Sequence, residues 1–348
     1  QRHLYVEASR GCPFKCECCL SSLDKTAWPF ELTRFLHELE TLYVRGVRQF
    51  KFVDRTFNLK VDTSLAILEF FLRKIDAAPE DPPFVHFELI PDHLPDQLKD
   101  AIARFPQGTL QFEIGIQTFD PEVQTRISRR QNDEKAAANL RWLREHSKAH
   151  LHVDLIAGLP GESVESFGRG FDRLVALAPH EIQFGILKRL RGAPIARHTQ
   201  AHDLRFNPDP PYNILSTDVI DFATMQRLSR FSRYWDMVAN SGRFVRTLPL
   251  LLGDAPFQRF LAFSDWLYGR TGQTHAIAHE RMVHAVQAFM TEEGGIGTEA
   301  ANRALIEDYR GQGGRSRLTF EDQDVARPVP VPRKKSATPP RQMRHLAG

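Results

Sequence analysis

Short apolar segments alternate with longer amphipathic segments up to about residue 190. The apolar, β-rich segments are Leu4–Ala8, Gln49–Val53, Phe84–Leu89, Leu110–Ile116, Leu151–Ala157 and Glu181–Leu187. The segments with helical periodicity between them are Phe30–Arg45, Thr63–Ala77, Leu94–Phe105, Asp133–His146 and Ser163–Ala176. Such alternation is typical of a parallel sheet with crossover helices, so we predict an α/β fold of six strand–helix units.

The pattern changes after residue 193, where strand signals stop. Helical spacing is clearest in Thr217–Asn240, and further helices are expected at Gln258–Tyr268 and Ala276–Thr291. From Val325 onward the chain is Pro-rich and basic without apolar periodicity. We therefore expect a core barrel over residues 1–193, a helical C-terminal domain over 194–324 and a disordered tail over 325–348.

Composition narrows the class of protein. The 348 residues suffice for one α/β barrel of about 200–250 residues and an appendage. A content of 42% hydrophobic and 26% charged residues is ordinary for a globular protein. The net charge of +3 is too small to indicate a nucleic-acid partner, and no apolar run is long enough for a membrane span. The chain starts at Gln1, inside the first expected strand, so we expect further residues upstream.

All four cysteines lie within eight residues, with the spacing Cys12-x3-Cys16-x2-Cys19 and Cys18 between the last two. Disulfides between cysteines this close would close only tiny loops, whereas clustered thiolates bind soft metals. Thiolates intended for metal need a reducing compartment, so we expect a cytoplasmic protein.

The number of thiolates bears on the kind of metal. A closed zinc site usually takes four ligands as two separated pairs, and the sequence holds no second pair. Three thiolates suit a four-iron four-sulfur cluster with one iron free of protein ligands. Zinc bound with a histidine or with all four cysteines, or a purely structural cluster, remains the alternative.

The Cys12–Cys19 loop after the first strand resembles the CxxxCxxC signature of radical S-adenosylmethionine (SAM) enzymes. The resemblance implies a partial (β/α)6 TIM-type barrel with a four-iron four-sulfur cluster on Cys12, Cys16 and Cys19. It further implies SAM chelated at the open iron, cleaved to methionine and a 5′-deoxyadenosyl radical, and an electron donor such as flavodoxin or ferredoxin. Cys18 stands where the family commonly has an aromatic residue, either as a small apolar substitute or as a redox-active ligand.

Residues at the ends of the second and third strands are candidates for the SAM pocket. The family's glycine-rich segment after the second strand is absent here, so Asp54 and Thr56 would contact SAM instead. The alternative for them is a solvated turn. Glu88 is a carboxylate among apolar neighbours, which is costly to bury without a donor. It is therefore a candidate for the ribose hydroxyls or the ammonium of SAM.

The fourth and fifth strands carry further candidates. The segment from Glu113 to Gln131 is similar to the GxQ(S/D)F…R segment of coproporphyrinogen III dehydrogenase-like enzymes, which implies SAM-pocket roles for Gln117 and Arg129. A guanidinium can pair with the methionine carboxylate, and Arg130 would serve if the register differs by one. The resemblance makes Asp154 a contact near adenine and ribose. Glu162 is expected only to cap the next helix.

Phrases such as Glu7–Pro13, Phe52–Asn58 and Leu187–Gly192 resemble a narrower group, radical SAM proteins with a cobalamin-binding domain and a helical C-terminal domain of unassigned function. This resemblance implies cobalamin, held by a domain absent from this chain, and methylation of an inert carbon in a small-molecule or peptide substrate. The alternatives are cobalamin-free chemistry, either coproporphyrinogen dehydrogenase-like or RNA modification, and a non-catalytic haem- or cofactor-binding module.

The helical region is expected to close the barrel mouth, because six strands leave a barrel open at the side. The apolar stripe of Phe222, Met225, Phe231 and Trp235 would provide the covering surface. Such a cover would exclude water from a radical intermediate and select the substrate.

Overall fold

The N-terminal half of the chain forms one curved parallel sheet. The computed structural model describes residues 3–24, 26–321 and 338–345, and its main sheet has the strand order β1-β4-β5-β6-β7-β8. Every neighbouring pair in this sheet is parallel. The strands are β1 (Leu4–Val6), β4 (Gln49–Phe52), β5 (Phe84–Leu89), β6 (Leu110–Gln117), β7 (His150–Ala157) and β8 (Glu181–Ile186).

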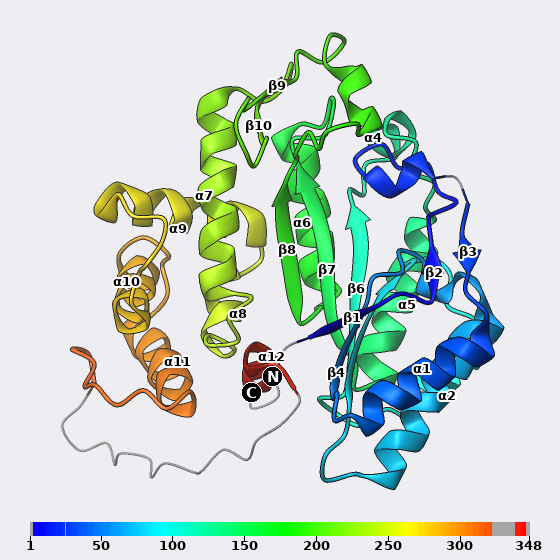
Figure 1. The fold of residues 1–348 in the computed structure, drawn as a ribbon. Helices are drawn as coiled ribbons and strands as arrows, with labels where there is room; N and C mark the ends of the chain where they lie inside the picture. Colours follow the sequence, from blue (N-terminus) through cyan, green and yellow to red (C-terminus); the bar gives the residue numbers. More distant parts are fainter. Residues whose placement is uncertain (1–2, 25, 322–337, 346–348) are drawn as a thin grey trace.

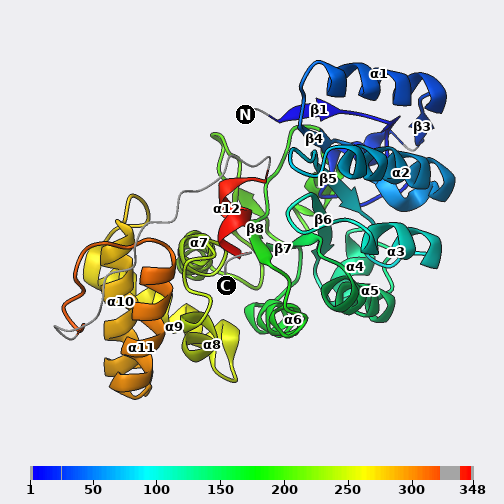
Figure 2. The same cartoon turned by 90° about the horizontal axis from the view of Figure 1, so that it is seen from below.

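Crossover helices cover the outer face of this sheet. They are α1 (Leu32–Val44), α2 (Val61–Ala77), α3 (Asp96–Ala103), α4 (Pro121–Arg126), α5 (Asp133–His146) and α6 (Val164–Ala176). Figure 1 shows the strands running upward in the view, and Figure 2 shows the helices along one side of the curved sheet. Among the described residues no ladder joins β1 to β8, so the barrel is open on one side.

The predicted fold is confirmed: six strand–helix units form a partial (β/α)6 barrel, and a mainly helical region follows. Two small hairpins were not predicted. They are β2 (Ser9–Arg10) with β3 (Trp28–Pro29), and β9 (Arg205–Phe206) with β10 (Ile214–Ser216). The second hairpin corrects the expectation that strands stop after residue 193. Strands of two or three residues are too short to produce a period-two pattern.

Side chains on the two faces of the sheet differ in kind. Phe50 and Phe52 point outward and pack on Phe71 of α2, with ring centroids 5.2 and 6.1 Å apart. Lys51, between them in sequence, points to the opposite face, because successive side chains of a strand alternate. There its ammonium lies 3.4 Å from Glu113 of β6. The outer face is therefore the apolar core and the inner face of the barrel is polar.

The helical region packs along the β8 edge of the barrel and does not close its mouth. It comprises α7 (Phe222–Val238), α8 (Thr247–Leu252), α9 (Pro256–Thr271), α10 (His279–Glu292) and α11 (Thr298–Gly311). Phe231 of α7 lies 4.8 Å from Phe184 of β8 by ring centroids. Figure 1 shows α10 and α11 on the far side of α7 from the strands and α8 at the lower end of α7, away from the strands' upper ends.

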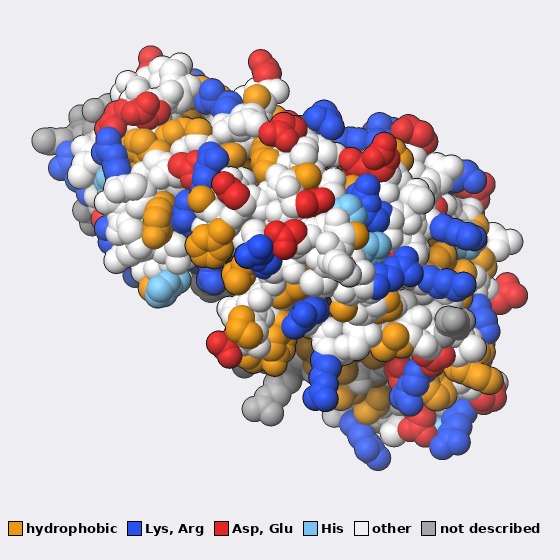
Figure 3. Space-filling model, turned by 90° about the horizontal axis from the view of Figure 1, so that it is seen from above, with side chains coloured by type: hydrophobic (Ala, Val, Ile, Leu, Met, Phe, Trp, Pro, Cys, Tyr) orange, Lys and Arg blue, Asp and Glu red, His pale blue; other side chains and the backbone are white. Residues whose placement is uncertain are grey.

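The expected cover is therefore wrong in its position. Phe231 and Trp235 are buried in the interface that joins α7 to β8, α6 and α9. Met225 is also buried and lies close to Gly158, just after β7, while Phe222 remains 55% exposed. The apolar stripe of α7 packs against β8, the strand at the edge of the sheet. Other segments therefore lie at the C-terminal ends of the strands. Figure 3 looks onto that end of the molecule, where Lys and Arg side chains lie among Asp and Glu side chains.

The expected tail over 325–348 also needs correction. Residues 325–337 and 346–348 lie outside the described residues, but the described part contains a helix, α12 (Pro340–His345). Arg341 of α12 donates to the buried Glu181 carboxylate at 2.9 Å and also contacts Asp236. Thr338 donates to the carbonyl of Gly108 at 2.6 Å. These contacts are polar and join residues that are distant in sequence. They therefore produce no apolar periodicity from which α12 could have been predicted.

None of the helices in the described residues is long and apolar enough to cross a membrane. The longest, α2 and α7, have 17 residues and several charged side chains.

Glu162 does not cap a helix. The N-cap of α6 is Ser163, whose hydroxyl accepts from the Ser166 amide at 3.2 Å. Glu162 is only 2% exposed, accepts from the Thr118 hydroxyl at 2.5 Å, and has a second oxygen without a hydrogen-bond partner among the described residues. Burial raises the pKa of Glu162 to about 8. The position of Glu162 next to the start of a helix therefore did not predict that its side chain is buried.

The raised pKa of Glu162 predicts a pH-dependent stability. Between the unfolded value near 4.5 and the folded value of about 8, the folded protein keeps a proton that the unfolded chain releases. The free energy of unfolding should therefore fall by roughly 3–4 kcal/mol between about pH 5 and pH 8 from this group. Glu162→Gln should remove that part of the pH dependence and gain stability over the wild type as pH rises.

Urea unfolding at several pH values measures this difference. Glu165→Gln is the matched control, because Glu165 lies on the same turn and is exposed. It should follow the wild-type curve. Parallel pH curves for Glu162→Gln and the wild type would show that Glu162 does not titrate as its burial implies.

Candidate functional site

The cysteine loop is presented by the β2–β3 hairpin at the end of the first strand. Gly11 starts the loop with φ of +90°, and a Cβ there would collide with the Thr26 carbonyl, so glycine is required. The Cys12 amide donates to the carbonyl of Asp24 at 3.3 Å, and the Cys19 amide donates to that of Cys16 at 3.2 Å. All four cysteines are free thiols.

Asp54 holds this hairpin in place. Its buried carboxylate accepts from the Ala8 amide at 2.9 Å, from the Ser9 hydroxyl at 2.7 Å and from the Ser9 amide. Asp54 therefore joins the end of β4 to the start of β2 and does not line the cavity beside the cysteines. The prediction that its side chain contacts SAM does not fit this arrangement. The alternative of a solvated turn is also wrong, because Asp54 is buried.

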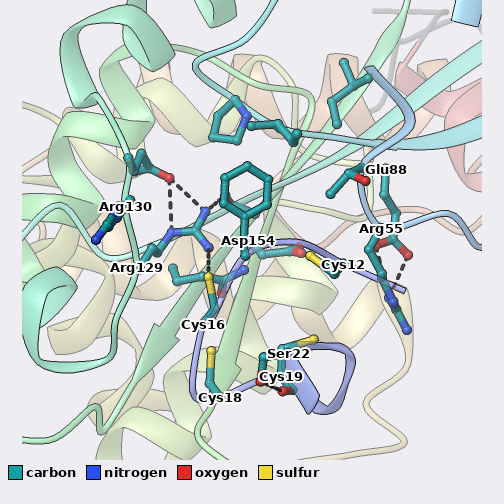
Figure 4. A pocket seen from close by; sticks show the side chains of 18 of the residues that line it. Cys12, Cys16, Cys18, Cys19, Ser22, Arg55, Glu88, Arg129, Arg130 and Asp154 are labelled. Carbon is teal, nitrogen blue, oxygen red and sulfur yellow. Dashed lines mark hydrogen bonds and ion pairs between the residues drawn. The ribbon is translucent and has the colours of Figure 1, made fainter. Parts of the chain in front are cut away.

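A cavity of about 220 Å³ lies between the cysteine loop and the inner face of the sheet (Figure 4). Besides all four cysteines, its lining includes Phe14, Arg55, Thr56, Glu88, Glu113, Gly115, Gln117, Arg129 and Asp154. The structure thus brings together the predicted residues Thr56, Glu88, Gln117, Arg129 and Asp154 with the three spaced cysteines, and leaves only Asp54 outside.

The arrangement of the thiols bears on the zinc alternative. Among the described residues, no group of three or more His, Cys, Asp or Glu side chains is placed to hold a single metal ion. A four-iron cluster takes each thiolate on a different iron, so its ligands stand further apart than those of one ion.

Cys18 differs from its neighbours in its surroundings. It packs against the hydrophobic core, and burial raises its pKa to about 12. Burial also raises the pKa of Cys12, which a bound metal would counteract by stabilising the thiolate. A thiol held protonated in apolar surroundings is a poor ligand, so the structure favours Cys18 as a small apolar substitute.

Glu88 has the donor partner that a buried carboxylate requires. Arg55 donates to both Glu88 oxygens from one nitrogen, at 2.8 and 3.0 Å. Burial raises the pKa of Glu88, and the neighbouring Arg55 opposes that change. Arg55 was not singled out from the sequence, although it directly follows Asp54. It neutralises Glu88 at the side of the cavity.

Arg129 lies directly beside the cluster loop. Its guanidinium donates to the Gly115 carbonyl and to Gln131, at 2.8 Å for the shorter Gln131 bond, and one nitrogen lies 3.6 Å from the Cys16 sulfur. Arg130 is exposed and points differently in Figure 4. Arg126, at the end of α4, donates to the Pro160 carbonyl at 2.6 Å. Arg129 and Arg130 both line the cavity, and Arg129 is the one that contacts a cysteine of the loop, so it is the better placed to meet a carboxylate there.

Two buried acceptors in the cavity make no hydrogen bond, although His152 Nε2 lies 3.6 Å from Asp154 Oδ1. Gln117 Oε1 and Asp154 Oδ1 have no hydrogen-bond partner among the described residues. Burial raises the pKa of Asp154 well above its usual value, and the Glu113 and Glu88 charges add to that effect. Unsatisfied buried acceptors are costly, so their presence indicates a ligand that carries donors. The ammonium and ribose hydroxyls of SAM are donors of this kind.

The backbone of β6 is distorted where it presents Gln117. The β6–β7 register shifts between Gly115 and Gln117, and Gln117 has φ of +71°. A Cβ on Gly115 would lie 2.4 Å from the side-chain nitrogen of Gln117, so the Gln117 side chain would have to move. Glu113, Gly115 and Gln117 share the inner face of β6 at period two, a signal that could have identified Glu113 as a lining residue from the sequence.

Comparison with known proteins gives the family. Residues 6–174 match the Radical SAM superfamily, and these residues contain the cysteine loop and the strands that line the cavity. Residues 6–174 form a domain of the radical SAM superfamily. Members of this superfamily use a four-iron four-sulfur cluster and SAM. Residues 200–318 match a second family, described as "Protein of unknown function (DUF4080)".

Individual relatives of this radical SAM chain cover only parts of it. The ribosomal protein uS12 methylthiotransferase RimO of Pseudothermotoga lettingae is 26% identical over 174 residues, which are 49% of this chain and 40% of RimO. The chain therefore spans less than half of that relative.

Two solved structures share the fold. The cobalamin-dependent SAM radical enzyme OxsB has a TM-score of 0.53 at 11% identity, over 88% of this chain and 58% of OxsB. The radical SAM methyltransferase TsrM from Kitasatospora setae has a TM-score of 0.51 at 19% identity, over 60% of this chain and 42% of TsrM. At these identities the likeness concerns the fold.

The position of Arg129 predicts a specific loss of SAM affinity. Arg129→Ala should weaken SAM binding to the reconstituted protein by about 10- to 100-fold, the worth of one charge-assisted hydrogen-bonded pair. Arg130→Ala is the matched control and should bind SAM normally. Isothermal calorimetry on both variants, with iron content verified, measures the effect. Unchanged affinity in Arg129→Ala with a loss in Arg130→Ala would exchange the two roles.

Proposed function

We propose that this chain is the catalytic part of a radical SAM enzyme that methylates, or otherwise functionalises, an unreactive carbon with the help of cobalamin. The observation that carries the radical SAM part is the cavity in which Cys12, Cys16 and Cys19 face the unsatisfied acceptors Gln117 and Asp154. The cobalamin part is supported by the shared fold with OxsB, a cobalamin-dependent enzyme, and with TsrM, a methyltransferase whose structure holds cobalamin.

The residues of this chain divide into ligands and orienting groups. When bound to Cys12, Cys16 and Cys19, a four-iron four-sulfur cluster supplies the electron that cleaves SAM to methionine and a 5′-deoxyadenosyl radical. Arg129 would orient the methionine carboxylate from beside Cys16. Gln117 and Asp154 would accept hydrogen bonds from the ammonium or ribose, and Thr56 and the Arg55–Glu88 pair would bound the cavity. The electron would come from a small carrier such as flavodoxin or ferredoxin.

The cobalamin would be held outside the 348 residues, since the sequence contains no cobalamin-binding motif. Retention of corrinoid by the full-length protein tests this proposal. After expression in cells supplied with cobalamin, the purified protein should show the corrinoid absorption bands at near-stoichiometric amounts. Purification free of corrinoid, with normal cluster content, would overturn the cobalamin part and leave the radical SAM part intact.

A second candidate is cobalamin-free chemistry on a macromolecule. The sequence match to RimO, which by name modifies a ribosomal protein, supports it. A corrinoid-free protein that forms 5′-deoxyadenosine from SAM would favour this candidate. A corrinoid-free protein that forms none would instead favour a haem- or cofactor-carrying module.

The ligand assignment makes a further prediction. A variant with Cys12, Cys16 and Cys19 all replaced by alanine should lose the iron and sulfide of the anaerobically reconstituted protein. Cys18→Ala should retain them, because the half-buried Cys18 packs against the hydrophobic core. Iron and sulfide quantitation on both variants measures this. A full cluster in the triple variant would rule out the assignment, and loss of the cluster in Cys18→Ala would make Cys18 a ligand.

A further inference from the structure

Glu17 lies between the cysteines of the loop and is nevertheless buried. Its exposed fraction is 2%, while the neighbouring Lys15 is exposed. A carboxylate is costly to bury unless its oxygens receive hydrogen bonds. In this loop the cost is increased, because cysteines that bind iron do so as thiolates and add negative charge nearby. The burial of Glu17 therefore requires hydrogen-bond donors or positive charges beside its carboxylate, which the cysteines do not provide.

The Glu17 side chain collects donors from two distant segments. Ser128, which follows α4, donates its hydroxyl to Oε1 at 2.6 Å. His198, in the 3₁₀ turn Pro194–His198 after β8, lies 2.8 Å from Oε2 through its Nε2 atom. Arg197 of the same turn forms an ion pair with Oε1. All three are more than 100 positions away in sequence, so the contacts are made only in the folded barrel.

The backbone of Glu17 makes the same two connections. Its amide donates to the Ile127 carbonyl at 3.0 Å, and its carbonyl accepts from the Ile195 amide at 3.0 Å. One residue of the cluster loop is thus fixed by main chain and side chain to the turn before Arg129 and to the segment after β8. Arg129 contacts Cys16, the neighbour of Glu17. The relative position of Cys16 and Arg129 therefore depends on the Glu17 contacts.

We propose that Glu17 is a positioning residue, which fixes the cluster loop against the Arg129 turn and against the segment after β8. This inference rests on the proposed function, since it concerns the loop assigned to the cluster. Glu17 touches neither SAM nor the thiols in this account. It sets the geometry in which Arg129 and the three cysteines meet the cofactor. The segment after β8, which lies at the barrel mouth, is thereby connected to the cluster loop.

The expected effects separate positioning from general stabilisation. Glu17→Gln keeps the shape of the side chain and loses the charge that pairs with Arg197. It should assemble a cluster, but its electron paramagnetic resonance signal should broaden and respond less to SAM. SAM affinity should fall about tenfold, which corresponds to the loss of one charge-assisted contact. Arg197→Gln should reproduce this effect, and the double variant should add little, because both changes break one interaction.

Lys15→Gln is the matched control, because Lys15 flanks Cys16 on the other side and has no hydrogen bond or ion pair in the described structure. It should behave as the wild type in every measurement. A second measurement needs no cluster. Hydrogen exchange in the cluster-free protein should be about tenfold faster over residues 12–22 in Glu17→Gln than in Lys15→Gln.

The cluster measurements and the hydrogen exchange distinguish a failure of the proposed function from a failure of the positioning role. If the wild type assembles no cluster, the proposed function fails, while hydrogen exchange still reports on the Glu17 contacts. The positioning role would be overturned if Glu17→Gln had the same spectrum, the same SAM affinity and the same rate of hydrogen exchange as the wild type. A second result would also overturn it: Glu17→Gln loses the cluster while Arg197→Gln and Ser128→Ala keep it. Glu17 would then support the cluster without the contacts to Arg197 and Ser128.

Discussion

The buried carboxylate of Asp54 holds the corner on which the site depends. It binds the backbone of Ala8 and Ser9, where the chain leaves β1 and turns into the hairpin that carries the cysteine loop. Two backbone amides and one hydroxyl converge on it, and removing such an acceptor would leave buried donors unsatisfied. Without this tie, a first strand of three residues at the sheet edge would be a weak support for the loop.

Apolar and polar side chains lie on opposite faces of the barrel sheet. Phenylalanines of the strands pack outward on the helices, whereas Lys51, Glu88, Glu113 and Asp154 line the interior. Because strand side chains alternate, each strand contributes to both. The helical region adds to the apolar side by covering β8, which leaves the mouth to the cysteine loop and to the segment after β8. The Glu17 contacts join these two segments.

Much of the fold and part of the site could be predicted from the sequence. The six strands and their helices have strong periodic patterns, and the cysteine spacing is specific. Residues reached through long-range polar contacts could not be predicted. Asp54 follows β4, Glu88 lies near the end of β5, and Glu162 directly precedes the N-cap of α6. Only the fold decides that Asp54 binds Ser9, that Glu162 binds Thr118, and that Glu88 faces the cavity. The apolar stripe of α7 was visible, but its partner β8 was not.

The central claim is that three cysteines hold a cluster whose fourth iron is reserved for SAM. Mössbauer spectroscopy of protein reconstituted with iron-57 tests it directly, because each iron contributes separately to the spectrum. The account predicts that SAM changes about one quarter of the iron signal, that of the iron without a cysteine ligand, and leaves the rest in place. A spectrum that SAM does not change, or a protein that binds zinc in place of iron, would contradict the account.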